Sequence, residues 1–431
     1  MKIGLLGNMN NNNFALLRYF RDLGCDADLL LFSTDGMGYS GHFKPECDTW
    51  QIEKWTPYIH KNSIADDPIS IFNFPTSYML WARSVLRSII NRNQYVYHPV
   101  TEKKIFRLYS SYTHLIGSGL TPSLLYRAGL RLSIFFPYAL GVEWLGDPVF
   151  LKKTKSANPI TRFVARRVIT QQTEAVKRAE SIIYADRSLT EETLTRIGVK
   201  GISLFCPMVY NREVFPEVID SPEVRNVIDR IDASDFSVLS HARHLWFRPD
   251  EISEPEWKGQ DKNNDWLIRG FSKFVEKRIV DSPLLILFEY GEDLDHSKRL
   301  CQELNISEYV YWMPKIDRKH ILYILSKVNV GVGEFTELPK ILFGGTGYEV
   351  LASGKPLLQA FNFSTEEFIE TFDAPPPPVL TVRRSDDILN HLVEMAKFPE
   401  KQISVGNKSR EWFDQHCGIG LAKKWVEILK K

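Results

Sequence analysis

Short apolar runs alternate with helix-spaced segments along this chain. The first apolar run covers residues 2–7 (KIGLLG), and residues 14–24 follow with helical spacing and a final glycine. Residues 28–32 (DLLLF) form a second apolar run. A strand, a helix and a second strand in this order predict a parallel sheet with helices on its faces.

The rest of the first half repeats this order. The patterns predict strands at 113–117, 132–136 and 181–185, and helices at 159–179 and up to Gly198. Residues 33–75 show neither pattern and are rich in Gly, Trp, Tyr and His, which predicts long loops. Long loops at strand ends often carry binding groups.

A second series of the same kind begins after residues 207–216. The expected strands are 237–240, 284–288, 309–312, 328–331 and 356–359, and the expected helices are 265–277, 297–304, 319–326, 347–353 and 385–395. Residues 374–378 (APPPP) predict a stiff polyproline connector. Two doubly wound α/β domains facing a cleft are therefore expected, with ligands at the carboxyl ends of the strands.

Length and composition agree with this picture. The chain has 431 residues, too many for one compact core, and we expect domains at 1–208 and 209–409. Apolar residues make up 44% and charged residues 25%, as in ordinary globular enzymes. The net charge of +1 gives no global field that would attract nucleic acid.

The cysteines and the hydropathy of the chain indicate in which cellular compartment the protein is expected. The five cysteines are scattered and form no CxxC pair, which fits reduced thiols in the cytoplasm. No run approaches 18 apolar residues, so no membrane span is expected. Basic residues gather on one expected helix, which favours a solvated face or an anionic membrane surface: Arg162, Arg166, Arg167, Lys177 and Arg178.

Two DxD pairs, at residues 26–28 and 293–295, match the pattern by which some transferases hold a divalent ion. Such pairs are common by chance, and the histidines show no HxH or HExxH spacing. We expect no bound metal.

The clearest candidate site is the stretch 344–358 (GGTGYEVLASGKPLL). Gly344, Gly345, Thr346 and Gly347 precede or open an expected helix, where free N–H groups attract anions and glycines allow close approach of a ligand. Glu349 follows, and its carboxylate could accept hydrogen bonds from the vicinal hydroxyls of a ribose. The alternative is an ordinary glycine-rich turn before a helix.

Two cations flank the loop after the first strand of the second series. Arg243 follows that strand directly, and Lys258 lies farther along the same loop. A guanidinium and an ammonium converging on a diphosphate would neutralise a leaving nucleotide. Solvated loop charges are the alternative.

Two candidates lie in the first half. Gly7 permits a tight turn under a bound group, and Asn8 with the following asparagines offers hydrogen-bond donors or helix capping. Glu143 follows an expected strand and could accept a proton or hold a sugar hydroxyl, unless it is an ordinary surface acid.

Taken in order, these segments resemble the GT-B glycosyltransferases, most closely their large family-four-like group. Residues 349–356 (EVLASGKP) are in register with the family segment E-A-M-A-x-G-x-P. Residues 257–259 (WKG) resemble its K-G element, and Arg243 stands where the family has an upstream arginine. Residues 207–216 are loosely similar to its interdomain segment. The resemblance covers nearly the whole chain.

The resemblance implies a nucleotide-sugar donor on the 209–409 domain and an acceptor on the 1–208 domain, with the last helix (410–431) packing back on the first domain. Glu349 would bind the ribose, while Arg243, Lys258 and the glycine loop would hold the diphosphate. These two cations and the helix terminus would replace a metal ion, so the nucleotide sugar is a co-substrate and no further cofactor is implied.

Two departures from the family concern the sugar end of the site. Ile341 stands where the family carries a second glutamate that contacts the donor sugar, and Glu334 and Glu337 are nearby but out of register. Residues 141–143 (GVE) replace the family's His-Gly-x-Asp loop. The donor sugar and the stereochemical outcome stay open.

The expected function is transfer of a sugar from a nucleotide diphosphate to a hydroxyl of a glycan or lipid-linked acceptor, in cell-surface polysaccharide synthesis. The expected location is the cytoplasm or the inner face of the membrane. A nucleotide-sugar epimerase of the same fold and a catalytically silent nucleotide-sugar-binding subunit are the alternatives.

Overall fold

The computed structural model describes residues 1–33, 42–64, 94–95, 98–99, 102–137, 159–185, 188–247, 261–336 and 344–431. These residues divide into two compact units. Unit 1 contains residues 1–45, 51–208 and 421–431, and unit 2 contains residues 46–50 and 209–420.

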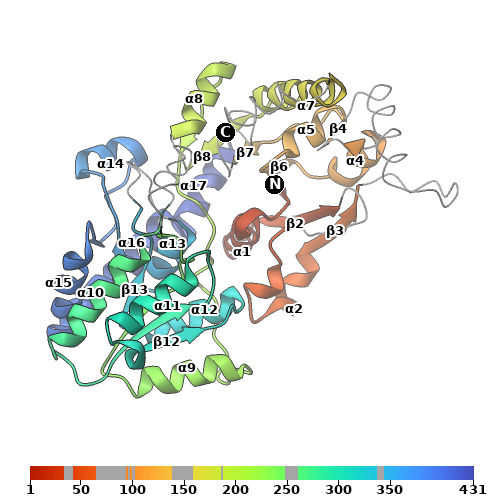
Figure 1. Cartoon of the computed structure of the whole chain (residues 1–431). Helices are drawn as coiled ribbons and strands as arrows, with labels where there is room; N and C mark the ends of the chain where they lie inside the picture. Colours follow the sequence, from red (N-terminus) through yellow and green to blue (C-terminus); the bar gives the residue numbers. More distant parts are fainter. Residues whose placement is uncertain are drawn as a thin grey trace, which may run out of the picture. The chain divides into compact units, whose positions relative to one another are not determined.

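Unit 1 is built on a parallel sheet. Its described strands have the order β3-β2-β1-β6-β7-β8-β9, with the bounds β1 Lys2–Leu6, β2 Asp26–Ser33, β3 Ile59–Ser63, β6 His114–Gly117, β7 Ile134–Phe135, β8 Ser181–Tyr184 and β9 Ile202–Ser203. The described helices are α1 Asn12–Asp22, α2 Ile52–Trp55, α4 Glu102–Tyr109, α5 Thr121–Tyr126, α7 Pro159–Lys177, α8 Ser188–Ile197 and α17 Ile419–Leu429, and β4 Gln94–Tyr95 pairs with β5 His98–Pro99 (Figure 1).

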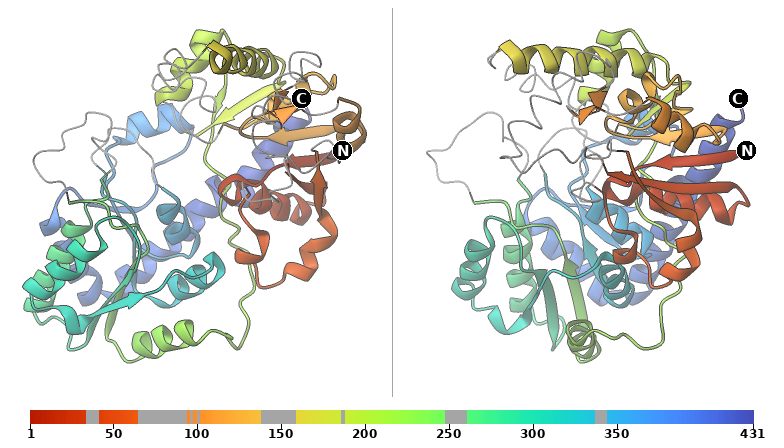
Figure 2. Two further views of the ribbon diagram at one scale, coloured as in Figure 1. Left: turned by 45° about the vertical axis from the view of Figure 1, so that its right-hand side comes forward. Right: turned by 90° about the vertical axis from the view of Figure 1, so that its right-hand side faces the viewer.

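Unit 2 has a second parallel sheet, of order β12-β11-β10-β13-β14-β15 in the described residues. Its strands are β10 Phe236–Ser240, β11 Pro283–Phe288, β12 Val310–Met313, β13 Val330–Val332, β14 Leu357–Gln359 and β15 Val379–Thr381. Its helices are α9 Pro222–Asp232, α10 Asn264–Glu276, α11 Leu294–Glu303, α12 Arg318–Lys327, α13 Gly345–Ala352, α14 Thr365–Phe372, α15 Ser385–Lys397 and α16 Pro399–His416 (Figure 2). This is the 3-2-1-4-5-6 order of a Rossmann fold.

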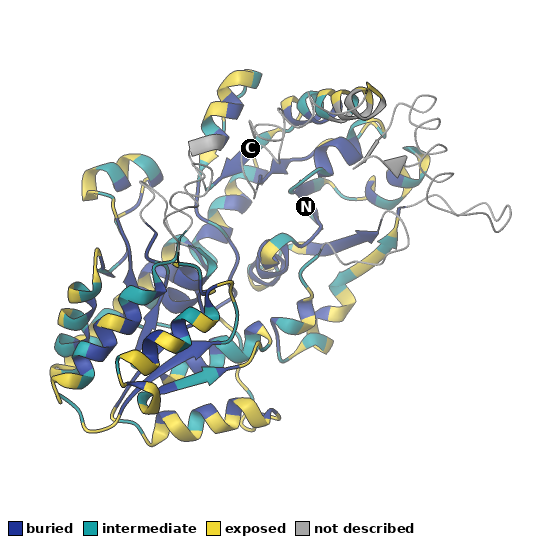
Figure 3. Ribbon diagram, viewed as in Figure 1, coloured by how far each residue is buried: buried dark blue, intermediate teal, exposed yellow. Residues whose placement is uncertain are grey.

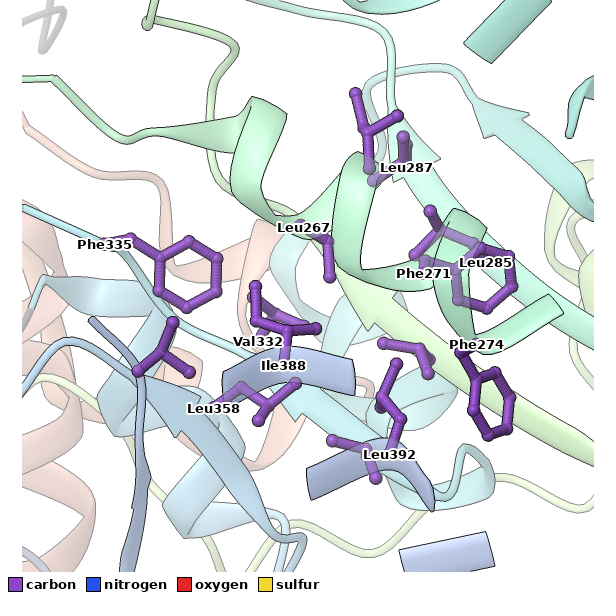
Figure 4. Packing of buried hydrophobic residues seen from close by; sticks show 14 of the residues in the cluster. Leu267, Phe271, Phe274, Leu285, Leu287, Val332, Phe335, Leu358, Ile388 and Leu392 are labelled. Atoms are coloured by element: carbon purple, nitrogen blue, oxygen red, sulfur yellow. The ribbon is translucent and has the colours of Figure 1, made fainter. Parts of the chain in front are cut away.

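The sheets are buried on both faces, and the helices show polar residues outward. In Figure 3 the strands are mostly dark blue and the outer helix surfaces yellow. Figure 4 shows α10 and α15 covering one face of the second sheet with Leu267, Phe271 and Leu392. Val330 and Val332 of β13 also belong to this cluster, whereas Gly331 faces Val350 of α13. Since side chains alternate along a strand, α13 lies on the opposite face.

The predicted fold class, two Rossmann-like α/β domains, is confirmed by the two sheets. The expectation of long loops at 33–75 is wrong for part of that range, because it contains α2 and β3. β3 reads IHKNS and has exposed positions, as an edge strand allows, so it lacks the apolar run that marks inner strands.

The C-terminal region also differs from the expectation. A single helix at 410–431 was expected, but α16 continues to His416 and α17 begins at Ile419. Residues 410–420 belong to unit 2 and residues 421–431 to unit 1. The short segment Glu46–Trp50 belongs to unit 2, although the residues on either side of it belong to unit 1.

Candidate nucleotide site in unit 2

The candidate site lies where the strand order of the second sheet reverses. β10 and β13 are neighbours there, and the chain leaves them in opposite directions along the sheet. His241 follows β10 directly, and Glu334 lies two residues beyond β13. Ligands of open α/β sheets bind outside the carboxyl ends of the strands at this point.

The glycine-rich stretch forms the start of α13. Gly344 is the N-cap residue, and its carbonyl accepts from the N–H of Gly347 at 3.1 Å. A Cβ on Gly344 would lie 2.8 Å from the carboxyl group of Glu334, so only glycine allows this close approach. The first amides of a helix have no acceptor within the helix, and no acid occupies the first turn of α13. This N-terminus can therefore receive an anion.

Thr346 adds a hydroxyl at the same helix end. Thr346 is 8% exposed, and its Oγ1 has no hydrogen-bond partner among the described residues. A buried hydroxyl without a partner is costly, and a ligand oxygen would satisfy it.

Glu349 lies one turn farther along α13 and is 7% exposed. Its Oε1 accepts from Nε of Arg318 and its Oε2 is bonded to Nε2 of His241, both at 2.5 Å. Burial alone would raise the pKa of Glu349, but the charges of Arg318 and His241 and their hydrogen bonds outweigh it and lower the pKa to about 2. The carboxylate stays ionised and keeps lone pairs for a further donor.

Arg243 is exposed, and its guanidinium has no salt bridge to a carboxylate in the part of the chain that the structure describes. The charge of Arg243 lowers the pKa of Tyr290, whose hydroxyl donates to the carbonyl of His241 at 2.5 Å. Burial, Glu349 and Glu334 raise the pKa of Tyr290 to about 12, while Arg243 opposes this rise. An exposed cation therefore lies in the electrostatic range of the candidate site.

Sequence reasoning gave no role to four members of the candidate site. Arg318 and His241 hold Glu349, and Lys262 bonds Glu334 at 2.5 Å. Glu334 was noted only as out of register with the family, yet its carboxylate is the one against Gly344. His241 and Glu334 could have been predicted, because residues just after the strands of a parallel sheet often contact a ligand. No local sequence pattern marks Arg318.

In unit 1 the side chain of Asn8 makes hydrogen bonds within the fold. Its Oδ1 accepts from the N–H of Phe14 at 3.0 Å, in the first turn of α1, and its Nδ2 donates to Phe43 at 2.8 Å. Gly7 has φ +76°, a conformation that favours glycine, and Nδ1 of His42 accepts from the N–H of Asn8 at 3.2 Å. Asn8 therefore accepts from a first-turn N–H of α1, although the N-cap residue of this helix is Asn11, and ligand contacts of Gly7 and Asn8 stay a prediction.

Four residues named in the sequence argument lie outside the described residues: Glu143, Lys258, Glu337 and Ile341. Three of the four aspartates of the DxD pairs have other partners. Asp26 and Asp28 both pair with Arg21, and Asp293 accepts from the N–H groups of Trp246 and Phe247. Within the described ranges, no group of three or more His, Cys, Asp or Glu side chains could hold a metal ion, and no helix is long and apolar enough to cross a membrane.

Comparison with known proteins rests on structure. No family model matches the chain, and no curated protein matches its sequence. The fold is similar to that of HepE from Anabaena in complex with UDP-glucose, at 13% identity and TM-score 0.54, covering 99% of this chain and 98% of the other. Sucrose-phosphate synthase from Thermosynechococcus elongatus gives 13% identity and TM-score 0.51, covering 100% and 98%.

TarM from S. aureus matches at 11% identity and TM-score 0.52, over 100% of both chains. These proteins share one architecture. The chain has the GT-B fold. The resemblance found in the sequence is confirmed at this level, because the likeness extends over the whole chain.

Proposed function

We propose that the chain is a glycosyltransferase that moves a sugar from a nucleoside diphosphate donor to a hydroxyl acceptor. The observation that carries the proposal is the arrangement at the start of α13. Free helix amides, the buried Thr346 hydroxyl and the ionised Glu349 lie within one and a half turns, at the reversal point of a Rossmann sheet. The neighbours HepE and TarM were solved with UDP, which supports a uridine nucleotide as the first donor to test.

Each group in unit 2 suits one part of such a donor. The α13 amides and Thr346 Oγ1 suit the diphosphate, and Glu349 suits the two ribose hydroxyls, because an ionised carboxylate accepts strong hydrogen bonds. Arg243 would neutralise the charge that develops on the leaving diphosphate. On the same reasoning Lys258 would share this task, and the transfer would need no metal ion.

Glu334 is the acid we propose for the sugar end. Its carboxylate lies against Gly344, the N-cap residue of α13, and its side chain is 17% exposed. Lys262 Nζ lies 2.5 Å from Oε2 of this carboxylate, and a carboxylate accepts hydrogen bonds from sugar hydroxyls. This assignment gives the site an acid that Ile341 cannot supply.

The acceptor is proposed to bind unit 1, near Gly7, Asn8 and Glu143, and to be a glycan or lipid-linked hydroxyl of cell-surface polysaccharide. On α7 of that unit, Phe163 is 48% exposed, with Arg167 over its ring at 5.4 Å. An exposed aromatic among cations suits the headgroup region of an anionic inner membrane face and supports a peripheral location there.

Calorimetry with UDP, GDP and ADP tests the donor site. Arg243→Ala should lower the affinity for the nucleoside diphosphate that binds best by about tenfold, since a charge-assisted contact is lost. Arg269→Ala, which removes an exposed arginine on α10, is the matched control and should leave the affinity unchanged. If none of the diphosphates binds to the wild-type protein, the proposal fails.

A turnover screen separates the transferase from its alternatives. The protein is incubated with UDP-glucose, UDP-galactose and UDP-N-acetylglucosamine, with and without candidate acceptors. Release of UDP that depends on an acceptor supports the transferase. Interconversion of the free donors would indicate an epimerase, and tight binding without release in any mixture would indicate a silent subunit.

A further inference from the structure

The segment Glu46–Trp50 belongs to unit 2, although the residues that precede and follow it belong to unit 1. The chain therefore enters unit 2 at Glu46 and leaves it after Trp50. Five residues cannot form a core of their own, so their contacts with unit 2 must fix them.

Contacts on both sides of Asp48 hold this segment at the start of α12. Lys319 Nζ donates to the carbonyl of Glu46 at 3.0 Å. Glu213 Oε1 accepts from Thr49 Oγ1 at 2.7 Å and from the N–H of Trp50 at 2.9 Å. The Trp50 ring meets His320 edge-on, with the ring centroids 4.8 Å apart.

Asp48 is thereby brought to Arg318. The Asp48 carboxylate is 1% exposed, and its Oδ1 lies 3.6 Å from Arg318 Nε. The same Nε donates to Glu349 Oε1 at 2.5 Å, and the Arg318 side chain is 9% exposed. One buried guanidinium is shared by two buried carboxylates, and such charges are tolerated only when each has a partner.

From this geometry we propose that Asp48 is a positioning residue for the nucleotide site. It pairs with the same Nε of Arg318 that donates to Glu349, and Arg318 in turn sets the place and charge of the Glu349 carboxylate. The inference rests on the proposed function, because it takes Glu349 to be the ribose contact. A chain of two buried ion pairs then links a segment of the first half of the sequence to donor recognition in the second.

The binding test compares UDP with 2′,3′-dideoxy-UDP, which lacks the hydroxyls that Glu349 would bind. We expect Asp48→Asn to weaken the binding of UDP by about tenfold and the binding of the dideoxy analogue by less than about twofold. The difference arises because Asp48 is coupled to Glu349, and Glu349 contacts only the hydroxyls that the analogue lacks. Asp48→Glu should recover part of the loss. Glu46→Gln removes an exposed charge from the same segment and should change neither affinity.

Equal weakening of both ligands by Asp48→Asn would show general loosening of unit 2 and would overturn the inference, as would no weakening of either. Where Asp48→Asn does not fold, Glu213→Gln tests the same point, because it releases the segment at Thr49 and Trp50. It should likewise weaken UDP more than the dideoxy analogue.

A ligand-free measurement separates this inference from the proposed function. The ring nitrogens of His241, bonded to Glu349, are followed by NMR in histidine-labelled protein. Asp48→Asn should shift these signals and Glu46→Gln should not. A shift in a protein that binds no nucleotide would refute the proposed function alone, whereas unchanged His241 signals would refute the positioning role.

Discussion

The ionisation of Glu349 ties the stability of unit 2 to pH. Its pKa falls from 4.5 to about 2 on folding, because Arg318 and His241 outweigh the effect of burial. A lowered folded pKa stabilises the fold above the unfolded pKa, and this stability is lost as the pH falls from about 4.5 to about 2. The shift corresponds to about 3 kcal/mol at neutral pH.

Urea unfolding at pH 5 and pH 3.5 measures this contribution. The wild-type protein should lose more unfolding free energy over this interval than Glu349→Gln, which has no carboxylate to protonate. Glu349→Gln should also be less stable at pH 7 by about 3 kcal/mol, because Arg318 stays buried with one partner fewer. Glu303→Gln, an exposed substitution on α11, should behave as the wild type. Parallel losses in all three proteins would contradict the assignment.

At the scale of elements, the packing of α13 on β13 places the site. A Cβ on Gly331 would lie 2.5 Å and 2.6 Å from the two methyl groups of Val350, so the absence of a side chain sets the distance between strand and helix. Gly331→Ala should cost about 2 kcal/mol by overpacking and should weaken diphosphate binding, because the helix that carries Thr346 and Glu349 has to move.

A double mutant identifies the cause. Val350→Ala removes the methyl groups that the new Cβ would meet, so Gly331→Ala should be less destabilising in the Val350→Ala background than in the wild type. Chemical denaturation of the two single variants and the double variant gives the coupling. Strictly additive losses would mean that the strand–helix contact does not set the position of α13.

The elements of this fold differed in how well the sequence predicted them. Inner strands such as β10 and β11 are continuous apolar runs, because both faces of the sheet are covered, and the predictions located them to within a residue or two at each end. β3 is a polar edge strand and was missed. α14 was also missed, although its capping box, Ser364 with Glu367, is visible in the sequence.

The same contrast applies to the site. The glycines and Glu349 are adjacent in sequence, so a local pattern sufficed to propose them as one site. His241 and Arg318 lie 108 and 31 residues away from Glu349 along the chain. Asp48 comes from the other half of the sequence. Only the folded sheet order and the course of the Glu46–Trp50 segment bring these charges together, and no periodicity encodes such a contact.

At the scale of the whole molecule, the chain passes between the two units four times, at residues 45/46, 50/51, 208/209 and 420/421. Neither unit is therefore a continuous stretch of sequence. A fragment that ends at residue 208 would lack α17 and would separate Asp48 from the rest of unit 2. Tests of the nucleotide site need the full chain for this reason.

The last crossing allows the two units to be destabilised separately. Trp425 of α17 is fully buried in unit 1 and meets Phe136 edge-on at 5.4 Å, while Trp412 of α16 is buried in unit 2 and donates to the carbonyl of Pro375 at 2.7 Å. Trp425→Ala should destabilise unit 1, and Trp412→Ala should destabilise unit 2, each by about 3–5 kcal/mol. The two variants are matched controls for each other, since the same substitution is made at two nearby positions of the chain.

Hydrogen–deuterium exchange with mass spectrometry reads both units in one experiment. In Trp425→Ala, protection should fall in peptides from β1, β2 and β6, while peptides from β10, β11 and β13 keep theirs, because local stability follows the contacts of each unit. Trp412→Ala should give the reverse. Loss of protection in both sheets for either variant would show that the units unfold as one cooperative body, and α17 would then stabilise the nucleotide site as well as unit 1.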